Sequence, residues 1–293
     1  MTDRDTWGPM AEPIHPPVPE GRPPWKDSAF LSFWDVEREV YGCAHVATSP
    51  NAPSSSTRFE INVRGRRLRV METPSSGTLT SESINFDLDG DITVDSPRVS
   101  GSFSGTPLFG LADYSTGGLV PAMVEGEPLQ HFQQPARVHG RFVLDGEQVL
   151  VDGVGWRDRT WGYRDESANW TEYVAFLAIF DDRAVTAMKF RYPDGRLAAD
   201  GFVLGAIGTE PEPITGIEVT RDAEGLAAAG RFTTEAGTSW QIRSEDRIGG
   251  FWVPMGHERV GPTMSSYDEF TLVSSPWGKG TGTHQHGVLR QLY

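Results

Sequence analysis

Residues 156–166 combine charged and aromatic side chains in a way that could support proton transfer. The segment holds three arginines, two tryptophans, one tyrosine and three acidic residues within eleven positions. Alternate side chains of a strand lie on the same face. If the segment is a strand, one face carries Trp156, Asp158, Thr160 and Arg164. The other face carries Arg157, Arg159, Trp161 and Tyr163.

Asp158 is the residue of this segment best suited to acid catalysis. A carboxyl group beside an aromatic ring and away from water tends to keep its proton, because burial disfavours the anion. Such an acid could protonate a substrate near neutral pH. The neighbouring arginines act in the opposite direction by favouring the anion. The sequence does not decide which effect is larger.

A purely structural role, in which charged and aromatic side chains contact one another along the strand, explains the same composition equally well. Arginine stacks on tryptophan, and arginine and aspartate form forked ion pairs. The segment could therefore pin two halves of the protein together without taking part in any reaction.

Three further polar residues could assist Asp158. His131, close to Gln133 in the sequence, could orient a substrate or a water molecule, although a structural histidine is the simpler interpretation. Tyr267 and Glu269 would share a strand face, where Tyr267 could hydrogen-bond an intermediate and Glu269 could act as a second acid or base. A strand with one wet face explains these two residues more simply.

His284 and His286 would lie on one strand face and could begin a metal site. A third ligand would have to come from residues 257–258 or 268–269. Because this spacing is nonspecific, we favour a solvated terminal strand and predict no bound metal.

The elements that must position these residues are predicted to be strands. Apolar and polar residues alternate over 59–63, 68–71 and 84–88, and Asp-Gly turns follow at 89–90, 145–146 and 194–195. Regular short strands without a long amphipathic helix are typical of an all-β sandwich or barrel.

The N-terminal part of the sequence differs in composition from the rest. Residues 1–25 are rich in proline and predict an extended arm. Residues 26–42 are the best candidate for a helix or an aromatic plug. We place a first domain at 26–153 and a second at 154–293.

Composition excludes several functional classes. The chain of 293 residues carries 26 basic and 40 acidic residues, a net charge of −14, which disfavours binding to nucleic acid or to anionic lipid. A single cysteine, Cys43, rules out an intramolecular disulfide and a cysteine-rich zinc site. The first residues lack the features of a signal peptide, and no apolar run could insert into a membrane, so we expect a cytoplasmic protein.

Residues 130–166 also resemble a known family. The residues concerned are His131-Phe132-Gln133-Gln134, Val138-His139-Gly140 and Gly153-Val154-Gly155-Trp156-Arg157-Asp158-Arg159-Thr160-Trp161-Gly162-Tyr163-Arg164-Asp165. They resemble a motif of the carotenoid 1,2-hydratase-like, or AttH-like, double-lipocalin superfamily. The similarity is greatest to a bacterial branch with the pattern Gly-x-Gly-x-Arg-Asp-x-Ser-Trp-Gly-x-Arg. Arg159 stands where the hydratases themselves have a histidine.

The resemblance implies two tandem lipocalin-like antiparallel β-barrels or sandwiches with few helices and an apolar cavity. Known members hydrate or cyclise isoprenoid and polyene substrates without a metal or an organic cofactor. Asp158 corresponds to the acid of the motif, and Trp161 corresponds to its indole.

Together, the residues and the resemblance predict a cofactor-independent hydratase or dehydratase, or an isomerase or cyclase, that protonates an alkene. Asp158 would donate the proton, with His131 and Tyr267 assisting. Side chains that contact a hydrophobic small-molecule substrate would come from Trp156, Trp161, Tyr163, Trp34, Arg159 and Arg164. Two other classes stay open: a non-catalytic carrier of a hydrophobic molecule, and an interaction protein whose own side chains fill the cavity. A homodimer also stays open.

Overall fold

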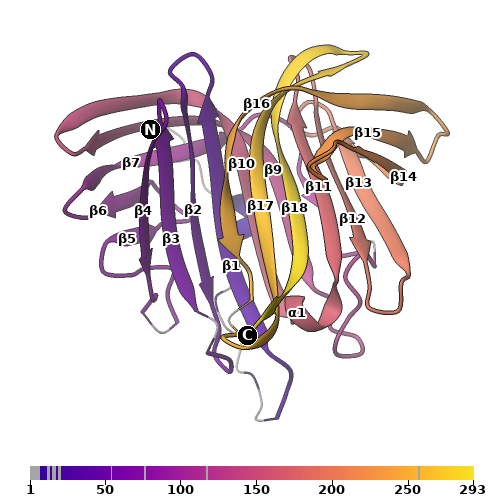
Figure 1. Ribbon diagram of the computed structural model, residues 1–293, viewed down its shortest axis with the longest axis horizontal. Helices are drawn as coiled ribbons and strands as arrows, with labels where there is room; N and C mark the ends of the chain where they lie inside the picture. Colours follow the sequence, from indigo (N-terminus) through magenta and orange to yellow (C-terminus); the bar gives the residue numbers. More distant parts are fainter. Residues whose placement is uncertain are drawn as a thin grey trace. The chain divides into compact units, whose positions relative to one another are not determined.

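The computed structural model describes residues 7–11, 14, 18, 21–53, 55–75, 77–116, 118–256 and 258–293. Its regular structure is almost entirely antiparallel β-strand, as predicted, and the chain divides into two compact units (Figure 1). The first unit comprises Met1–Leu108 and Ala122–Tyr163, and the second comprises Phe109–Pro121 and Arg164–Tyr293. The expected boundary between residues 153 and 154 lies inside a continuous strand, so the first unit extends to Tyr163.

The first unit is built on one curved antiparallel sheet. Its described elements are η1 (Gly8–Ala11), β1 (Trp25–Asp35), β2 (Val40–Thr48), β3 (Ser56–Val63), β4 (Arg66–Glu72), β5 (Ile84–Phe86), β6 (Ile92–Asp95), β7 (Val99–Pro107), β9 (Gln130–Leu144) and β10 (Glu147–Tyr163). The strand order is β4-β3-β2-β1-β10-β9-β7-β6-β5. The long strand β10 therefore lies at the middle of the sheet, between β1 and β9.

A cluster of phenylalanines forms the core of the first unit. Phe59 on β3 contacts Phe103 on β7 at 6.0 Å between ring centroids, although β2, β1, β10 and β9 lie between these strands in the sheet order. Phe142 packs against both rings at 5.3 and 5.6 Å. Such contacts across the sheet require it to curl around the apolar cluster, as in a barrel.

The prediction of a helix over residues 26–42 is wrong. This region forms strands β1 and β2, joined by a turn at residues 36–39. Nearly all of β1 is buried, on both faces, so its sequence lacks the alternation of a strand with one wet face. Leu31 and Phe33 point to the phenylalanine core, while Trp34 is buried on the opposite face.

The described part of the proline-rich arm is packed rather than simply extended. Residues Gly8–Ala11 form a 3-10 turn, and Trp7 and Met10 are buried. The Trp7 amide donates to the Leu88 carbonyl at 3.1 Å, and its ring meets Phe86 edge-on. Burial of these two side chains overrides the extended conformation that we expected here. Pro13, Pro16, Pro17 and Pro19 lie outside the described residues.

The second unit is a closed antiparallel barrel. Its elements are β8 (Ala112–Asp113), α1 (Glu166–Asn169), β11 (Glu172–Ile179), β12 (Ala184–Arg191), β13 (Leu197–Leu204), β14 (Glu212–Arg221), β15 (Ala227–Thr234), β16 (Ser239–Pro254), β17 (Gly261–Ser275) and β18 (Gly278–Leu292). Strands β11 to β18 follow one another around the barrel. The predicted hairpin at Asp194-Gly195 is confirmed as the β12–β13 connection, where Gly195 has a φ of 84°. Part of the barrel interior is filled by aromatic rings. The ring centroid of Trp240 lies 4.7 Å from that of Phe232 and 4.4 Å from that of Trp277.

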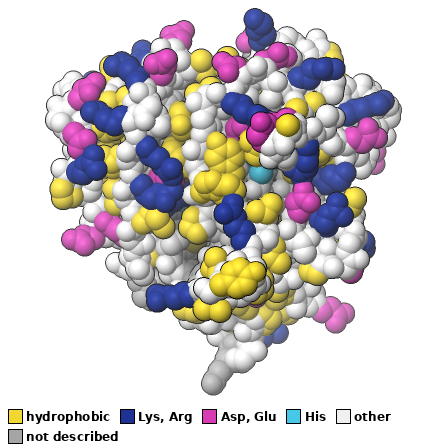
Figure 2. Space-filling model, in the orientation of Figure 1, with side chains coloured by type: hydrophobic (Ala, Val, Ile, Leu, Met, Phe, Trp, Pro, Cys, Tyr) yellow, Lys and Arg dark blue, Asp and Glu magenta, His cyan; other side chains and the backbone are white. Residues whose placement is uncertain are grey.

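The molecular surface mixes charges of both signs. On the face seen in Figure 2, basic and acidic side chains are interspersed with apolar patches. Within the described ranges, no helix has the length and apolarity that crossing a membrane requires.

Candidate functional site

Strand β10 brings Asp158 together with side chains of its two neighbours. Asp158 is paired with Phe30 on β1 and with Gln133 on β9. One step along the ladder, Thr160 is paired with His131. Because directly paired residues of an antiparallel sheet point to the same face, these side chains form one group.

Polar contacts hold the Asp158 carboxylate on two sides. Gln133 Nε2 donates to Oδ2 at 2.7 Å, and Thr160 Oγ1 donates to Oδ1 at 3.3 Å. His131 Nε2 lies 3.6 Å from Oδ2, and His131 Nδ1 lies 2.7 Å from Thr160 Oγ1. The side chain of Asp158 is 19% exposed and that of His131 is 16% exposed. The carboxylate is therefore oriented by hydrogen bonds and still reaches solvent.

When Thr160 donates to Asp158, the roles of the other hydrogen-bonding atoms follow. Thr160 has a single hydroxyl proton, which it donates to Asp158. Its oxygen therefore accepts a hydrogen bond from Nδ1–H of His131. In the neutral ring, Nε2 then carries the lone pair that faces Asp158. His131 Nε2 and Asp158 Oδ2 thus face each other at 3.6 Å.

Aromatic side chains lie on the same face as Asp158. Phe30 is its direct neighbour on β1, and Trp156 precedes it by two residues and is only 1% exposed. Trp34 is also buried, and it pairs with Val154, which is four residues from Asp158 along β10. Trp156 and Phe30 are thus adjacent to Asp158, whereas Trp34 lies further along the sheet.

The opposite face of β10 carries the ladder that the sequence also suggested. Arg159 and Asp27 form an ion pair in which both side chains are fully buried. Arg159 also donates to the Ser28 carbonyl at 2.9 Å, and its guanidinium lies 5.2 Å from the Trp161 ring centroid. The two interpretations of the segment thus apply to different faces of one strand. Arg159 and Trp161 point away from Asp158.

The predicted grouping of Tyr163 and Arg164 with the site differs from the structure. Tyr163 packs edge-on against Trp25 at 5.1 Å and accepts a hydrogen bond from Arg22 at 3.2 Å. Strand β10 ends at Tyr163, so the alternation does not reach Arg164. Arg164 begins the second unit's main segment and forms an ion pair with Glu166 at 2.8 Å.

Tyr267 belongs to the second unit and has its own neighbours. It lies on β17 between Trp252, at 5.3 Å, and His286, at 6.4 Å between ring centroids. Glu269 follows two residues later and forms an ion pair with Arg247 on β16. The sequence predicted that Tyr267 and Glu269 share a face but missed Arg247.

The metal site considered from the sequence lacks support among the described residues. No group of three or more histidine, cysteine or acidic side chains in those ranges has an arrangement that could hold a metal ion. His257, one of the candidate third ligands, lies outside the described residues.

Comparison with known proteins identifies the family and the fold. The chain belongs to a family described as a domain of unknown function, DUF7064, whose model matches residues 8–274. A search of curated protein sequences finds no match.

Solved structures with this fold include a named hydratase. The chain is similar to an AttH-like protein from Nitrosomonas europaea, with 16% identity over 90% of this chain and 92% of that one and a TM-score of 0.61. It is similar to kievitone hydratase from Nectria haematococca, with 15% identity over 99% and 97% of the two chains and a TM-score of 0.60. It is also similar to CghA bound to Sch210972, with 12% identity over 92% and 89% and a TM-score of 0.57. At these identities the likeness establishes the fold, which is the double-lipocalin fold that the motif implied.

Proposed function

We propose that this protein is a cofactor-independent enzyme that protonates a carbon–carbon double bond of a hydrophobic isoprenoid or polyene substrate. The reaction is a hydration or dehydration, or an isomerisation or cyclisation. The observation that carries the proposal is the Asp158 carboxylate, oriented by Gln133 and Thr160 and placed within 3.6 Å of His131. The fold, which this chain has in common with kievitone hydratase, supports the same class of reaction.

The reaction begins with protonated Asp158. Its Oδ2 proton moves to one alkene carbon, which leaves a carbocation on the other carbon and a carboxylate on Asp158. The electron-rich faces of Phe30 and Trp156 stabilise the positive charge.

His131 completes the cycle. In a hydration, a water molecule adds to the carbocation and loses a proton to His131 Nε2. In an isomerisation, the carbocation itself loses a proton from a neighbouring carbon to the same nitrogen. The proton then returns from His131 to Asp158 across the 3.6 Å that separates them, and the site is restored.

Isotope incorporation tests this proposal. Compounds that co-purify with the protein, together with a panel of isoprenoid and polyene alkenes, are incubated with it in heavy water and separately in oxygen-18-labelled water. A hydratase incorporates both isotopes, whereas an isomerase or cyclase incorporates deuterium alone. A carrier binds a compound and incorporates neither, and that outcome would refute the proposal.

Two variants assign the incorporation to the site. Asp158→Asn keeps the size of the side chain but cannot donate the acid proton, and we expect the rate to fall by about 10²–10⁴-fold. Asp152→Asn makes the same change on the same strand, at a side chain that is 44% exposed and paired with Arg137. Its rate should equal that of the unmodified protein. Full activity in Asp158→Asn, with an unchanged fold by circular dichroism, would also reject the mechanism.

A further inference from the structure

The interior of the second unit's barrel contains a polar cluster next to its aromatic core. His284 on β18 is paired with Glu269 on β17 and with Phe176 on β11, and its ring lies 4.6 Å from that of Phe176. Because Phe176 belongs to the apolar core of the barrel, all three side chains point inward. His286 follows His284 on the same face of β18. We call Glu269, His284 and His286 the barrel triad.

The barrel triad is deeply buried and incompletely hydrogen-bonded. The exposed fractions of His284, Glu269 and His286 are 0%, 1% and 5%. Arg247 Nε contacts Glu269 Oε1 at 2.6 Å, and His286 Nε2 lies 3.5 Å from Glu269 Oε2. His284 Nε2 and His286 Nδ1 have no hydrogen-bond partner, and the contact between His286 and Glu269 is too long for a good hydrogen bond. A buried polar group without a hydrogen-bond partner destabilises the folded protein. A ligand that satisfied several of these groups at once would reduce this destabilisation.

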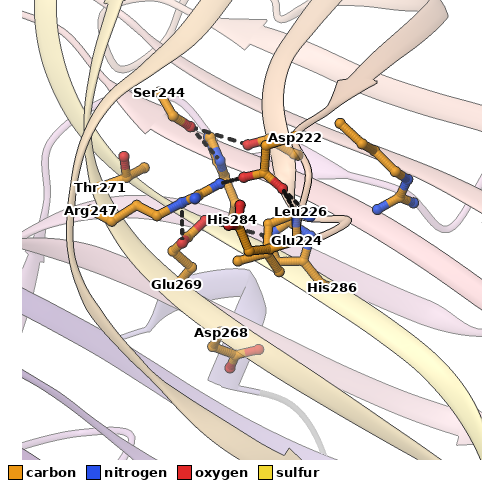
Figure 3. Close-up of polar contacts among 12 residues, drawn as sticks. Asp222, Glu224, Leu226, Ser244, Arg247, Asp268, Glu269, Thr271, His284 and His286 are labelled. Carbon is orange, nitrogen blue, oxygen red and sulfur yellow. Dashed lines mark hydrogen bonds and ion pairs between the residues drawn. The ribbon is translucent and has the colours of Figure 1, made fainter.

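The neighbours of His284 determine what it offers to a ligand. Ser244 Oγ donates to the Ala227 carbonyl at 3.3 Å and lies 3.2 Å from His284 Nδ1 (Figure 3). Nδ1 must therefore carry the proton, and Nε2 presents a lone pair. Burial, and to a lesser extent the neighbouring His286, lowers the pKa of His284 to about 3, so the ring is uncharged near neutral pH. His284 Nε2 is thus an acceptor.

The complete site calls for an uncharged group that both donates and accepts. His284 Nε2 and Glu269 Oε2 are acceptors, and His286 carries at least one N–H donor. Arg247 neutralises Glu269, so neither an anion nor a cation is favoured. In Figure 3, Arg247 reaches from β16 between Asp222 and Glu269, while Asp268 lies apart from the cluster. A hydroxyl group has the required combination of donor and acceptor.

Aromatic side chains lead from the barrel triad toward solvent. Tyr267 pairs with His286 across β17 and β18, and Trp252 pairs with Tyr267 across β16 and β17. Trp252 is 46% exposed, and the Arg290 guanidinium lies 3.8 Å from its ring centroid. The rings of Tyr267 and Trp252 can pack against a carbon skeleton whose polar end reaches the triad.

A divalent metal is a poorer match than a hydroxyl group. Arg247 already occupies one carboxylate oxygen of Glu269. The ring centroids of His284 and His286 are 6.5 Å apart, whereas two imidazoles on one tetrahedral zinc ion would be about 5 Å apart, given Zn–N bonds of about 2 Å.

We propose that the barrel of the second unit binds the hydroxyl end of an uncharged aromatic or alicyclic small molecule. Glu269, His284 and His286 hydrogen-bond the hydroxyl group, and Tyr267 and Trp252 contact the carbon skeleton. This binding site does not depend on the reaction assigned to Asp158.

Matched probes test the site by calorimetry and NMR. p-Cresol and p-xylene differ only in a hydroxyl group that replaces a methyl group, and p-toluate carries a carboxylate in its place. p-Cresol should bind at least about ten-fold more tightly than p-xylene, which corresponds to one hydrogen bond, and p-toluate should not bind. In a long-range ¹⁵N spectrum of the unmodified protein, p-cresol should shift the unprotonated His284 Nε2 signal. Equal affinity for p-cresol and p-xylene, or no shift of this signal, would overturn the proposal.

Variants locate the binding in the barrel. His284→Leu and Glu269→Gln should each remove most of the preference for p-cresol over p-xylene. Gln285→Leu changes the next residue of β18, which points to the opposite face, and should leave the preference unchanged. If His284→Leu and Glu269→Gln both keep the preference for p-cresol over p-xylene, the proposed binding site is wrong. Zinc added alone should neither raise the melting temperature nor shift both histidine signals, and if it did both, a metal site would replace this proposal.

Discussion

Acidification should destabilise the second unit through His284. This ring is fully buried, and its pKa is lowered from 6.5 to about 3, mainly by burial. Arg247 on β16 adds positive charge nearby and the adjacent His286 on β18 also lowers this pKa, while Glu269 on the neighbouring strand β17 is paired with His284. A proton on His284 is therefore far less favourable in the folded protein than in the unfolded chain.

The direction and the size of the change in folding stability with pH follow from this difference in the pKa of His284. The unfolded chain takes up a proton below pH 6.5, whereas the folded protein does so only near pH 3, so stability is fully present above pH 6.5 and falls as the pH decreases toward 3. At about 1.4 kcal/mol per pH unit, the total loss is about 5 kcal/mol, and about 2 kcal/mol of it has occurred at pH 5.

Hydrogen exchange at pH 7.5 and pH 5.0 provides the assay. Peptides from β11, β17 and β18 report the free energy of opening of the second unit alone, after correction for the intrinsic pH dependence of exchange. The unmodified protein should lose about 2 kcal/mol more between these pH values than His284→Leu, which has no proton to gain. Gln285→Leu should behave like the unmodified protein. Equal losses in the protein with and without His284 would refute the reasoning.

Two further predictions concern the first unit. Arg159→Met leaves the buried carboxylate of Asp27 without its ion-pair partner and should cost about 3–5 kcal/mol in chemical denaturation, and adding Asp27→Asn should recover part of the loss. An unchanged denaturation midpoint in the single variant would contradict this. Gly155→Ala places a methyl group 1.9 Å from the Ser32 carbonyl oxygen on the adjacent strand, so it should cost at least the roughly 1–3 kcal/mol of an overpacked core. A melting temperature equal to that of the unmodified protein would show that β1 and β10 can separate at this point.

Local alternation allowed the two faces of β10 to be predicted. The period of two separates Asp158 and Thr160 from Arg159 and Trp161 without any knowledge of the partners. It could not show which strands flank β10. The contacts of Asp158 depend on a register with β9 that spans 25 residues of sequence, and the partner of Arg159, Asp27, is 132 residues away.

Two features of the fold lacked a local signal altogether. Residues 26–42 resemble a helix or an aromatic plug rather than a strand, because β1 is buried on both faces and therefore shows no alternation. Arg247 escaped notice because β16 contains register shifts between Ser244 and Asp246 and between Arg247 and Gly249. A β-bulge re-aims the side chains that follow it, so counting residues in steps of two fails across β16.

The ion pairs Arg159–Asp27 and Arg247–Glu269 differ in how easily they can open. Arg159 and Asp27 are both fully buried, so separating them would leave two charges in a low-dielectric interior. Arg247 is 35% exposed, whereas its partner Glu269 is 1% exposed. Arg247 can therefore turn toward solvent and keep its charge hydrated, with Asp222 available as its second partner. Of these two pairs, only Arg247–Glu269 can therefore open at a moderate cost.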